Sequence, residues 1–402
     1  MPIRIAHFAD LHYCAKHLRW VDKAFDFAIQ HAISNGAQAA VISGDSFDSA
    51  INLHEPAVTA FFRRVKQLAE AMPVLILQGT ASHDRPGSLS PLRALGSRVL
   101  VSDSIHQAAL TGDGWVLSES HTFGPADGVY GVAHALFSCL PSINKGGIAA
   151  VLGVEHAAEA AGQAVLDLCR SWAPANDRAR QLRVPTILVS HGTVNGCVTE
   201  TARAMVSPDH EFTTGALFGA GASATMLGHI HAHQYWHDAD MRHAIAYTGS
   251  LTKMIYGHKG ATGYLLWDVS NDGATFEHIP CPSREMIECE FDGPPDMDNL
   301  AGAAQGADGA YVRIRYSIDE EHRGSVDQDA IRALFAAAEE VKIEARVNPI
   351  QRVRAAGISQ APTLAQKLSG WCNTTDTEPE PLLDRLRLLE SMEVPAIVGG
   401  VL

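Results

Sequence analysis

The sequence predicts an α/β fold in which buried strands alternate with helices and carry polar side chains at one end. Short apolar runs recur along the first 231 residues, and most of them lead directly into Asp or His. The first three runs are separated by segments with helical periodicity. Strands joined by helical crossovers lie parallel, so their carboxyl ends meet at one edge, where α/β proteins bind ligands.

The central run is residues 39–43, which ends in Gly44-Asp45 and has a second carboxylate at Asp48. The run is short and apolar, as expected of a buried strand of a parallel sheet. Glycine lets the backbone turn sharply. We therefore expect Asp45 to lie at the carboxyl edge of the sheet.

The run before it and the run after it follow the same pattern. Residues 4–9 lead into Asp10-Leu11-His12, and residues 74–77 lead into a segment that ends Ser82-His83-Asp84. Apolar residues at helical spacing predict helices over about 20–34 and 55–71. The series therefore reads β-α-β-α-β.

The second half supplies two more such runs. Residues 185–189 end in Ser190-His191-Gly192, and residues 223–227 end in Gly228-His229-Ile230-His231. A helix is predicted over 155–172. Between 97 and 144 the pattern indicates shorter and less regular strands.

Together the five runs deliver a set of carboxylates and imidazoles: Asp10, His12, Asp45, His83, His191, His229 and His231. Any one of them alone is better explained as a capping or surface residue, but five in strand context indicate a metal site. Oxygen and imidazole donors without thiolate suit Mn, Fe or Zn. The donors exceed the needs of one ion. Two ions bridged by Asp45 are the usual arrangement for phosphoester hydrolysis.

Composition limits the possible functions. The chain has 402 residues, of which 46% are hydrophobic and 19% charged, and a net charge of −14. This balance argues against a protein that coats nucleic acid, although it leaves room for a local DNA site. We find no apolar stretch long enough to span a membrane and no signal-peptide pattern. Seven scattered cysteines without a C-x-x-C pair favour a cytoplasmic protein.

The five motifs resemble those of calcineurin-like metallophosphoesterases. More narrowly, Tyr247-Thr248-Gly249-Ser250-Leu251, with Lys259-Gly260 and residues 263–266 after it, resembles SbcD-type nucleases. These are nuclease subunits of the SbcC–SbcD DNA repair complex and of its phage counterparts. The resemblance implies a β-sandwich flanked by helices, two divalent metal ions with Mn favoured over Mg, Fe or Zn, and hydrolysis of DNA.

The resemblance also implies a role for each residue. One metal would bind Asp10, His12, Asp45 and His231, and the second would bind Asp45, Ser82, His191 and His229. His83 would contact the scissile phosphate and protonate the leaving oxygen, oriented by Asp48. An imidazole held by a carboxylate keeps one tautomer. Asp48 as a loop carboxylate that caps the next helix stays open as an alternative.

The chain departs from the family pattern at two places. Where relatives carry Gly-Asn-His-Asp, it has Ala81-Ser82-His83-Asp84. A serine hydroxyl is a weaker ligand than an asparagine carbonyl, so the second metal is expected to bind less tightly. Gly257-His258 replaces a common Gly-Glu, with no consequence that we can derive.

Composition shifts after Pro280, where further prolines mark a linker and the entry to a smaller unit. We expect a metallophosphoesterase domain over 1–280, an α+β capping domain over 281–355 and a helical tail over 356–402. In the cap, 311–316 and 341–347 alternate like strands around a helix over 328–340. The capping domain offers cations that could touch DNA phosphates or simply form a solvated strand face: Arg313, Arg315, Lys342 and Arg346.

The tail is predicted to form helices over 363–371 and 380–392. Four leucines at helical spacing make an apolar stripe on the second of them: Leu382, Leu383, Leu386 and Leu389. The stripe either packs on its own chain or binds an SbcC-type ATPase, the partner that the resemblance implies. The family also implies a homodimer.

We therefore expect a metal-dependent DNA nuclease that acts as an exonuclease, with endonuclease activity also open, in repair or recombination. A small-molecule nucleotide phosphoesterase and a non-catalytic scaffold with a weakened metal site are the alternatives.

Overall fold

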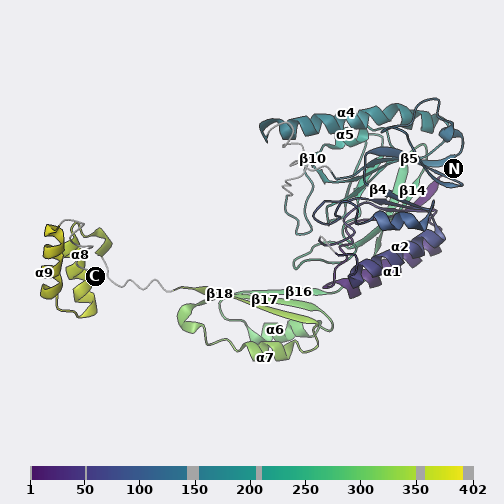
Figure 1. Ribbon diagram of the computed structural model, residues 1–402. Helices are drawn as coiled ribbons and strands as arrows, with labels where there is room; N and C mark the ends of the chain where they lie inside the picture. Colours follow the sequence, from purple (N-terminus) through teal and green to yellow (C-terminus); the bar gives the residue numbers. More distant parts are fainter. Residues whose placement is uncertain (1, 50–51, 143–153, 205–210, 350–357, 393–402) are drawn as a thin grey trace. The chain divides into compact units, whose positions relative to one another are not determined.

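The computed structural model describes residues 2–49, 52–142, 154–204, 211–349 and 358–392. Two large sheets dominate its N-terminal part (Figure 1). The first has the strand order β15-β14-β1-β2-β3-β4, in which β1 to β4 are parallel, β14 is antiparallel to β1, and β15 is antiparallel to β14. Its strands are β1 (Ile3–Phe8), β2 (Ala39–Ile42), β3 (Val74–Leu77), β4 (Val99–Ser102), β14 (Gly263–Val269) and β15 (Ala274–Pro280).

The second sheet has the order β12-β13-β11-β8-β7-β5-β6 and a parallel centre made of β13, β11, β8 and β7. Its strands are β5 (His106–Thr111), β6 (Gly114–Leu117), β7 (Ala133–Leu140), β8 (Thr186–His191), β11 (Ala224–Gly228), β12 (Gln234–His237) and β13 (Ala244–Tyr247). Beside it, β9 (Thr193–Val194) pairs with β10 (Glu211–Phe212).

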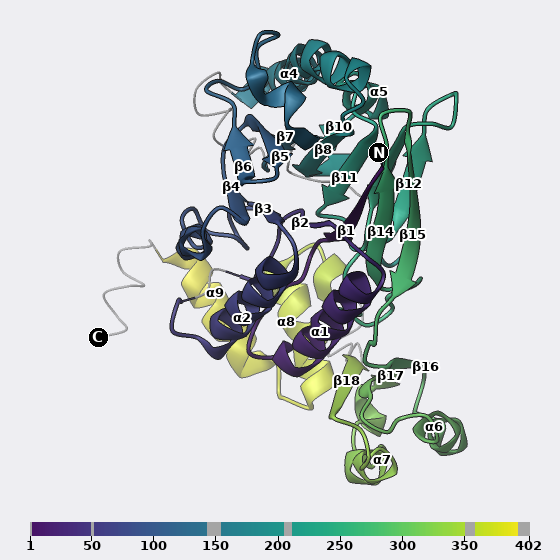
Figure 2. The ribbon, with the colours of Figure 1, turned by 90° about the vertical axis from the view of Figure 1, so that its right-hand side faces the viewer.

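The two sheets pack face to face, and helices cover their outer faces (Figure 2). The alternation of a strand explains the layers, because Ile3 and Ile5 of β1 lie in the core between the sheets while Ala6 and Phe8 belong to a core shared with helices. Helices α1 (Leu18–Ser34) and α2 (Pro56–Ala71) contribute to that outer core. Helices α4 (Val154–Gln181) and α5 (Thr214–Phe218) cover the second sheet. The predicted α/β class, a β-sandwich flanked by helices, is confirmed.

Helix α4 is longer than predicted. The sequence pattern suggested an end at Trp172, but the helix continues through Pro174 to Gln181. Tertiary packing outweighs the proline here, because Trp172 is fully buried and donates from Nε1 to the His121 carbonyl at 2.7 Å. Beyond the proline, Asn176 is also buried and donates to the Ala220 carbonyl at 2.7 Å.

A smaller three-stranded sheet follows, with the order β16-β17-β18. Its elements are β16 (Met286–Asp292), α6 (Met297–Ala304), β17 (Tyr311–Asp319), α7 (Gln328–Leu334) and β18 (Glu340–Asn348). The α+β pattern agrees with the prediction in β17 and β18. The sequence predicts a linker after Pro280, but the structure has β16 in this segment. The helix predicted over 328–340 ends at Leu334.

The chain divides into two compact units. The first comprises Met1–Cys289, Asp298–Ile314 and Arg332–Lys342, and the second comprises Glu290–Met297, Arg315–Ile331 and Ile343–Leu402. In the second unit, α8 (Leu364–Thr375) and α9 (Glu380–Ser391) pack together. No helix in the described ranges is long and apolar enough to cross a membrane.

Candidate metal centre

The polar ends of four strands meet in the first unit. Asp10 and Asp45 follow β1 and β2 of the first sheet, His191 ends β8, and His229 and His231 follow β11 of the second sheet. These residues and His12 form two groups, Asp10–His12–His231 and Asp45–His191–His229, in each of which the possible ligand atoms lie within 4.8 Å of one another. The sandwich therefore brings together six of the residues predicted from the sequence.

Backbone conformation turns several of these side chains toward the centre. Asp10, His12 and Asp45 have φ angles of 50°, 51° and 52°, and His229 has φ 102°. Such conformations cost about 1–3 kcal/mol each for a residue with a Cβ and persist only where the surroundings enforce them. Here hydrogen bonds between the two main chains enforce them, because Asp10 N donates to the Gly44 carbonyl and His12 N donates to the Asp45 carbonyl, both at 3.1 Å.

Glycines allow the loops to approach so closely. A Cβ on Gly44 or Gly228 would collide with His191 Nδ1, and one on Gly79 would collide with the Asp45 carboxylate. Each glycine is thus required by a neighbour's backbone or ligand side chain.

We expect Gly228→Ala to lower the free energy of unfolding by about 1–3 kcal/mol, because the new methyl group would overlap the Ser43 carbonyl in a packed core. Urea denaturation measures the change. Gly215→Ala in α5 is the matched control, since a Cβ there meets nothing within 4 Å. Equal stability of the two variants would contradict the close packing at Gly228.

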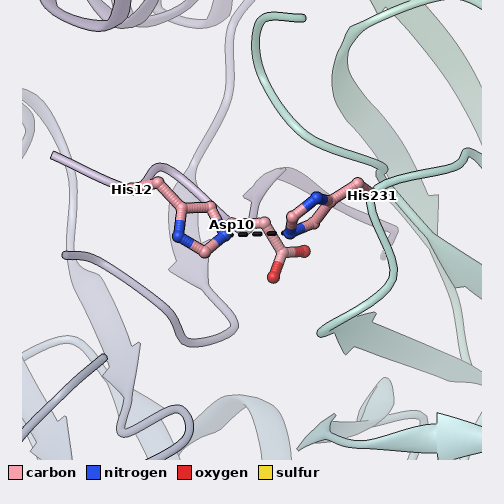
Figure 3. Close-up of side chains that lie close together, drawn as sticks. All are labelled: Asp10, His12 and His231. Atoms are coloured by element: carbon pink, nitrogen blue, oxygen red, sulfur yellow. Dashed lines mark hydrogen bonds between the residues drawn. The ribbon is translucent and has the colours of Figure 1, made fainter. Parts of the chain in front are cut away.

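In the first group, two imidazoles face each other (Figure 3). His12 Nε2 lies 2.9 Å from His231 Nε2, and the Asp10 carboxylate accepts from His229 N at 2.9 and 3.1 Å. Burial lowers the pKa of His12 well below its usual value, so its ring is neutral. Burial also raises the pKa of Asp10 to about 6. Two converging ring nitrogens beside a buried carboxylate are the donors that a divalent cation requires.

In the second group, Asp45 and His191 are the closest pair. His191 Nδ1 donates to the Ser43 carbonyl at 2.7 Å, which leaves Nε2 facing Asp45 Oδ1 at 3.2 Å. Burial opposes charge on both residues, but their mutual attraction prevails. It holds the pKa of Asp45 below its usual value and raises that of His191 to about 9.

A buried imidazole nitrogen in the second group indicates whether a metal ion fits there. In the described part of the chain, the Nε2 atom of His229 is buried and has no hydrogen-bond partner. Burial lowers the pKa of His229 to about 4, so this ring is neutral and keeps a lone pair. A buried imidazole nitrogen without a partner is costly unless something binds it. Together with the carboxylates, the two groups fit two divalent cations.

The structure places His83 and Asp48, the two predicted catalytic residues, beside the centre. The contact between them is not the predicted one. His83 Nδ1 lies 2.6 Å from the main-chain carbonyl of Asp48, and its Nε2 lies 3.9 Å from Asp45 Oδ2. The Asp48 carboxylate instead lies 3.6 Å from His12 Nδ1. His83 is therefore oriented by the backbone of Asp48 rather than by its carboxylate.

Ser82, the predicted weak ligand, is exposed and its hydroxyl lies 3.4 Å from Thr80 Oγ1. Thr80 makes the contact with the centre, because its N and Oγ1 donate to Asp45 Oδ1 at 2.8 and 2.9 Å. Nothing in the chain's pattern distinguished Thr80, which lies in the same loop.

Asp84 has no role in the sequence prediction, and the structure places it between two loops of the centre. It is fully buried and accepts from the main-chain nitrogens of Ser46 and Gly79 at 3.0 Å each. Burial raises its pKa to about 7, with a further contribution from the Asp45 charge. Asp84 thus ties the loop that carries His83 to the loop that carries Asp45. Its position beside His83 was the available signal.

The Tyr247–Ser250 element supports the histidine loops. Tyr247 lies in β13, and its hydroxyl donates to the Gly192 carbonyl at 2.5 Å while it accepts from Val194 N at 2.8 Å. Ser250 N donates to the His231 carbonyl at 3.0 Å. The element therefore braces the segments that follow His191 and His231.

Comparison with protein-family models found no match for this chain, and comparison with curated proteins found none either. Among solved structures, the chain is similar to a dimetal phosphatase from Danio rerio. The alignment has 10% sequence identity and a TM-score of 0.40, and covers 69% of this chain and 99% of the phosphatase chain.

Proposed function

We propose that this chain is a metal-dependent phosphodiesterase that cleaves DNA with two divalent cations, of which Mn is our first choice. The observation that carries the proposal is the convergence of two groups of buried carboxylate and imidazole donors at the carboxyl ends of strands from both sheets. Two adjacent cations suit in-line displacement at phosphorus.

The residues divide into ligands and a proton carrier. The first cation would be held by Asp10, His12 and His231, and the second by His191 and His229, with Asp45 shared between them. Bound cations supply Lewis acidity toward a phosphoryl oxygen and make a water molecule more acidic.

His83 stands at the rim, with its side chain 30% exposed. With Nδ1–H held by the Asp48 carbonyl, a second proton at Nε2 makes a cation. Its position suits contact with a phosphate oxygen and proton transfer to the leaving oxygen.

DNA as the substrate is supported by the Tyr-x-Gly-Ser element and the motifs after it, which resemble those of SbcD-type nucleases. On the same ground we propose an SbcC-type ATPase partner, a homodimer and a role in repair or recombination. Helix α9 has no buried residue, and Leu388 and Leu389 are exposed, so this helix retains an apolar surface for a partner.

Two arginines of the smaller sheet, which the sequence offered as possible DNA contacts, are already paired with carboxylates. Arg313 donates to Glu288 in the first unit, and Arg315 donates to Glu344 at 3.0 Å in the second. Both guanidinium groups are thus already paired with carboxylates, which fits a solvated strand face. DNA steering by these two arginines is not part of the proposal.

Mn-dependent cleavage of linear DNA by the purified chain tests the proposal. We expect the wild type to cut, His83→Ala to lose activity, and Ser82→Asn to keep or raise it. Hydrolysis of free nucleotides without DNA cleavage would indicate the small-molecule phosphoesterase instead. The exposed Ser82 favours the scaffold alternative, which would be indicated by an inert wild type that Ser82→Asn makes active.

A further inference from the structure

Glu200 stands behind a predicted metal ligand. Its Oε2 lies 3.9 Å from His231 Nδ1, on the side of the ring opposite to the Nε2 atom that faces His12. The Glu200 side chain is 17% exposed. This is an ion-pair distance, longer than a hydrogen bond. A carboxylate on the outer nitrogen of a metal-bound histidine orients the ring and strengthens the ligand.

The loop that carries Glu200 is anchored on both sides. Gln234 of β12 accepts from Val198 N at 3.0 Å and donates to the Val198 carbonyl at 2.9 Å. Lys259 N donates to the Glu200 carbonyl at 2.7 Å. The backbone that carries Glu200 is therefore held near His231 by these contacts.

His12 and His191 can be compared with His231 by the group that faces the Nδ1 atom of each ring. His12 Nδ1 faces a second carboxylate, that of Asp48, at 3.6 Å. His191 Nδ1 meets only a neutral group, the Ser43 carbonyl, at 2.7 Å. Both imidazoles of the first group are thus backed by negative charge, whereas in the second group His191 is backed by a peptide dipole.

We propose that Glu200 is a positioning residue for His231, and that together with Asp48 it makes the Asp10–His12–His231 position the tighter of two unequal metal positions. Two anionic groups beyond the ligands stabilise a cation more than a neutral carbonyl does. The chain then loads its metals in sequence, with the first position filled before the Asp45–His191–His229 position. This inference rests on the proposed metal-dependent function.

Calorimetric titration of the metal-stripped chain with Mn²⁺ tests the proposal without any substrate. We expect two binding phases in the wild type. Glu200→Gln keeps the size of the side chain and removes its charge. It should raise the dissociation constant of the tighter phase about 10- to 100-fold and leave the weaker phase unchanged. Glu200→Asp should restore part of the affinity.

Asp238→Asn is the matched control. Asp238 Oδ2 lies 3.2 Å from His243 Nδ1, and the two side chains are 22% and 23% exposed, so this pair resembles Glu200–His231 but belongs to neither metal group. Both Mn²⁺ phases should survive this substitution. A His191→Ala chain, which impairs the second position alone, should keep the tight phase and its sensitivity to Glu200→Gln.

Three results would overturn the inference. An unchanged tight phase in Glu200→Gln would show that Glu200 does not position His231, while the proposed function would stand. Loss of the tight phase in His191→Ala would assign tight binding to the second position. A wild type that binds no Mn²⁺ at all would overturn the metal-dependent function as well.

Discussion

Asp45→Asn should abolish phosphodiester hydrolysis and remove most of the stabilisation that metal gives to the chain. Asn can still accept the hydrogen bonds from Thr80 at Oδ1, so the loop keeps its shape, but the charge that faces His191 and the cations is lost. Metal at about 100 times its dissociation constant stabilises a folded chain by about 2.7 kcal/mol per site. For a unit of about 300 residues, whose unfolding entropy is about 0.6 kcal/mol/K, that shifts the melting temperature by about 4 °C.

Thermal melting with and without Mn²⁺ measures this effect. The wild type should show the full shift, and Asp45→Asn little of it. Asp103→Asn is a suitable control, because Asp103 makes an exposed ion pair with Arg93 at 2.8 Å and belongs to neither metal group. An Asp45→Asn chain that is stabilised by Mn²⁺ as strongly as the wild type would be incompatible with the proposed centre.

His83→Ala should reduce kcat about 10²- to 10⁴-fold, the usual contribution of a general acid or base. Metal binding should be unchanged, because His83 belongs to neither group of ligands and its Nε2 is 3.9 Å from Asp45. Parallel measurement of kcat and of bound Mn separates the two effects. Loss of metal together with activity would make His83 a ligand instead.

Asp48→Ala should cost much less kcat than His83→Ala. The main-chain carbonyl of residue 48, which accepts from His83 Nδ1, remains in the variant. The missing carboxylate faces His12, so the main loss should be in Mn²⁺ affinity. Equal kcat losses for the two variants would contradict this and would support the prediction from the sequence that the Asp48 carboxylate orients His83.

The sequence predicted the fold class and the main donors because both depend on local pattern. A buried apolar run that leads into Gly-Asp or Gly-His is typical of a strand that ends at a site, which singled out Asp45 and His229, and His191 stood out because it follows a similar run directly. Strand alternation also predicted β17 and β18. What the pattern could not show was that the five runs divide between two sheets rather than forming one.

The remaining errors concern contacts between distant segments. Glu200 and Thr80 gain their roles only when their loops reach His231 and Asp45, so no local spacing marks them. The orientation of Asp48, carbonyl toward His83 and carboxylate toward His12, depends on one loop conformation. Helix α4 passes Pro174 because packing on the second sheet outweighs an intrinsic preference.

Anomalous diffraction from crystals grown with Mn²⁺ tests the central claim most directly. We predict two Mn peaks in the chain, one within bonding distance of Asp10, His12 and His231 and the other within bonding distance of Asp45, His191 and His229. Crystals that diffract well but show no Mn peak at either group, at millimolar Mn²⁺, would contradict the account of this site as a two-metal centre.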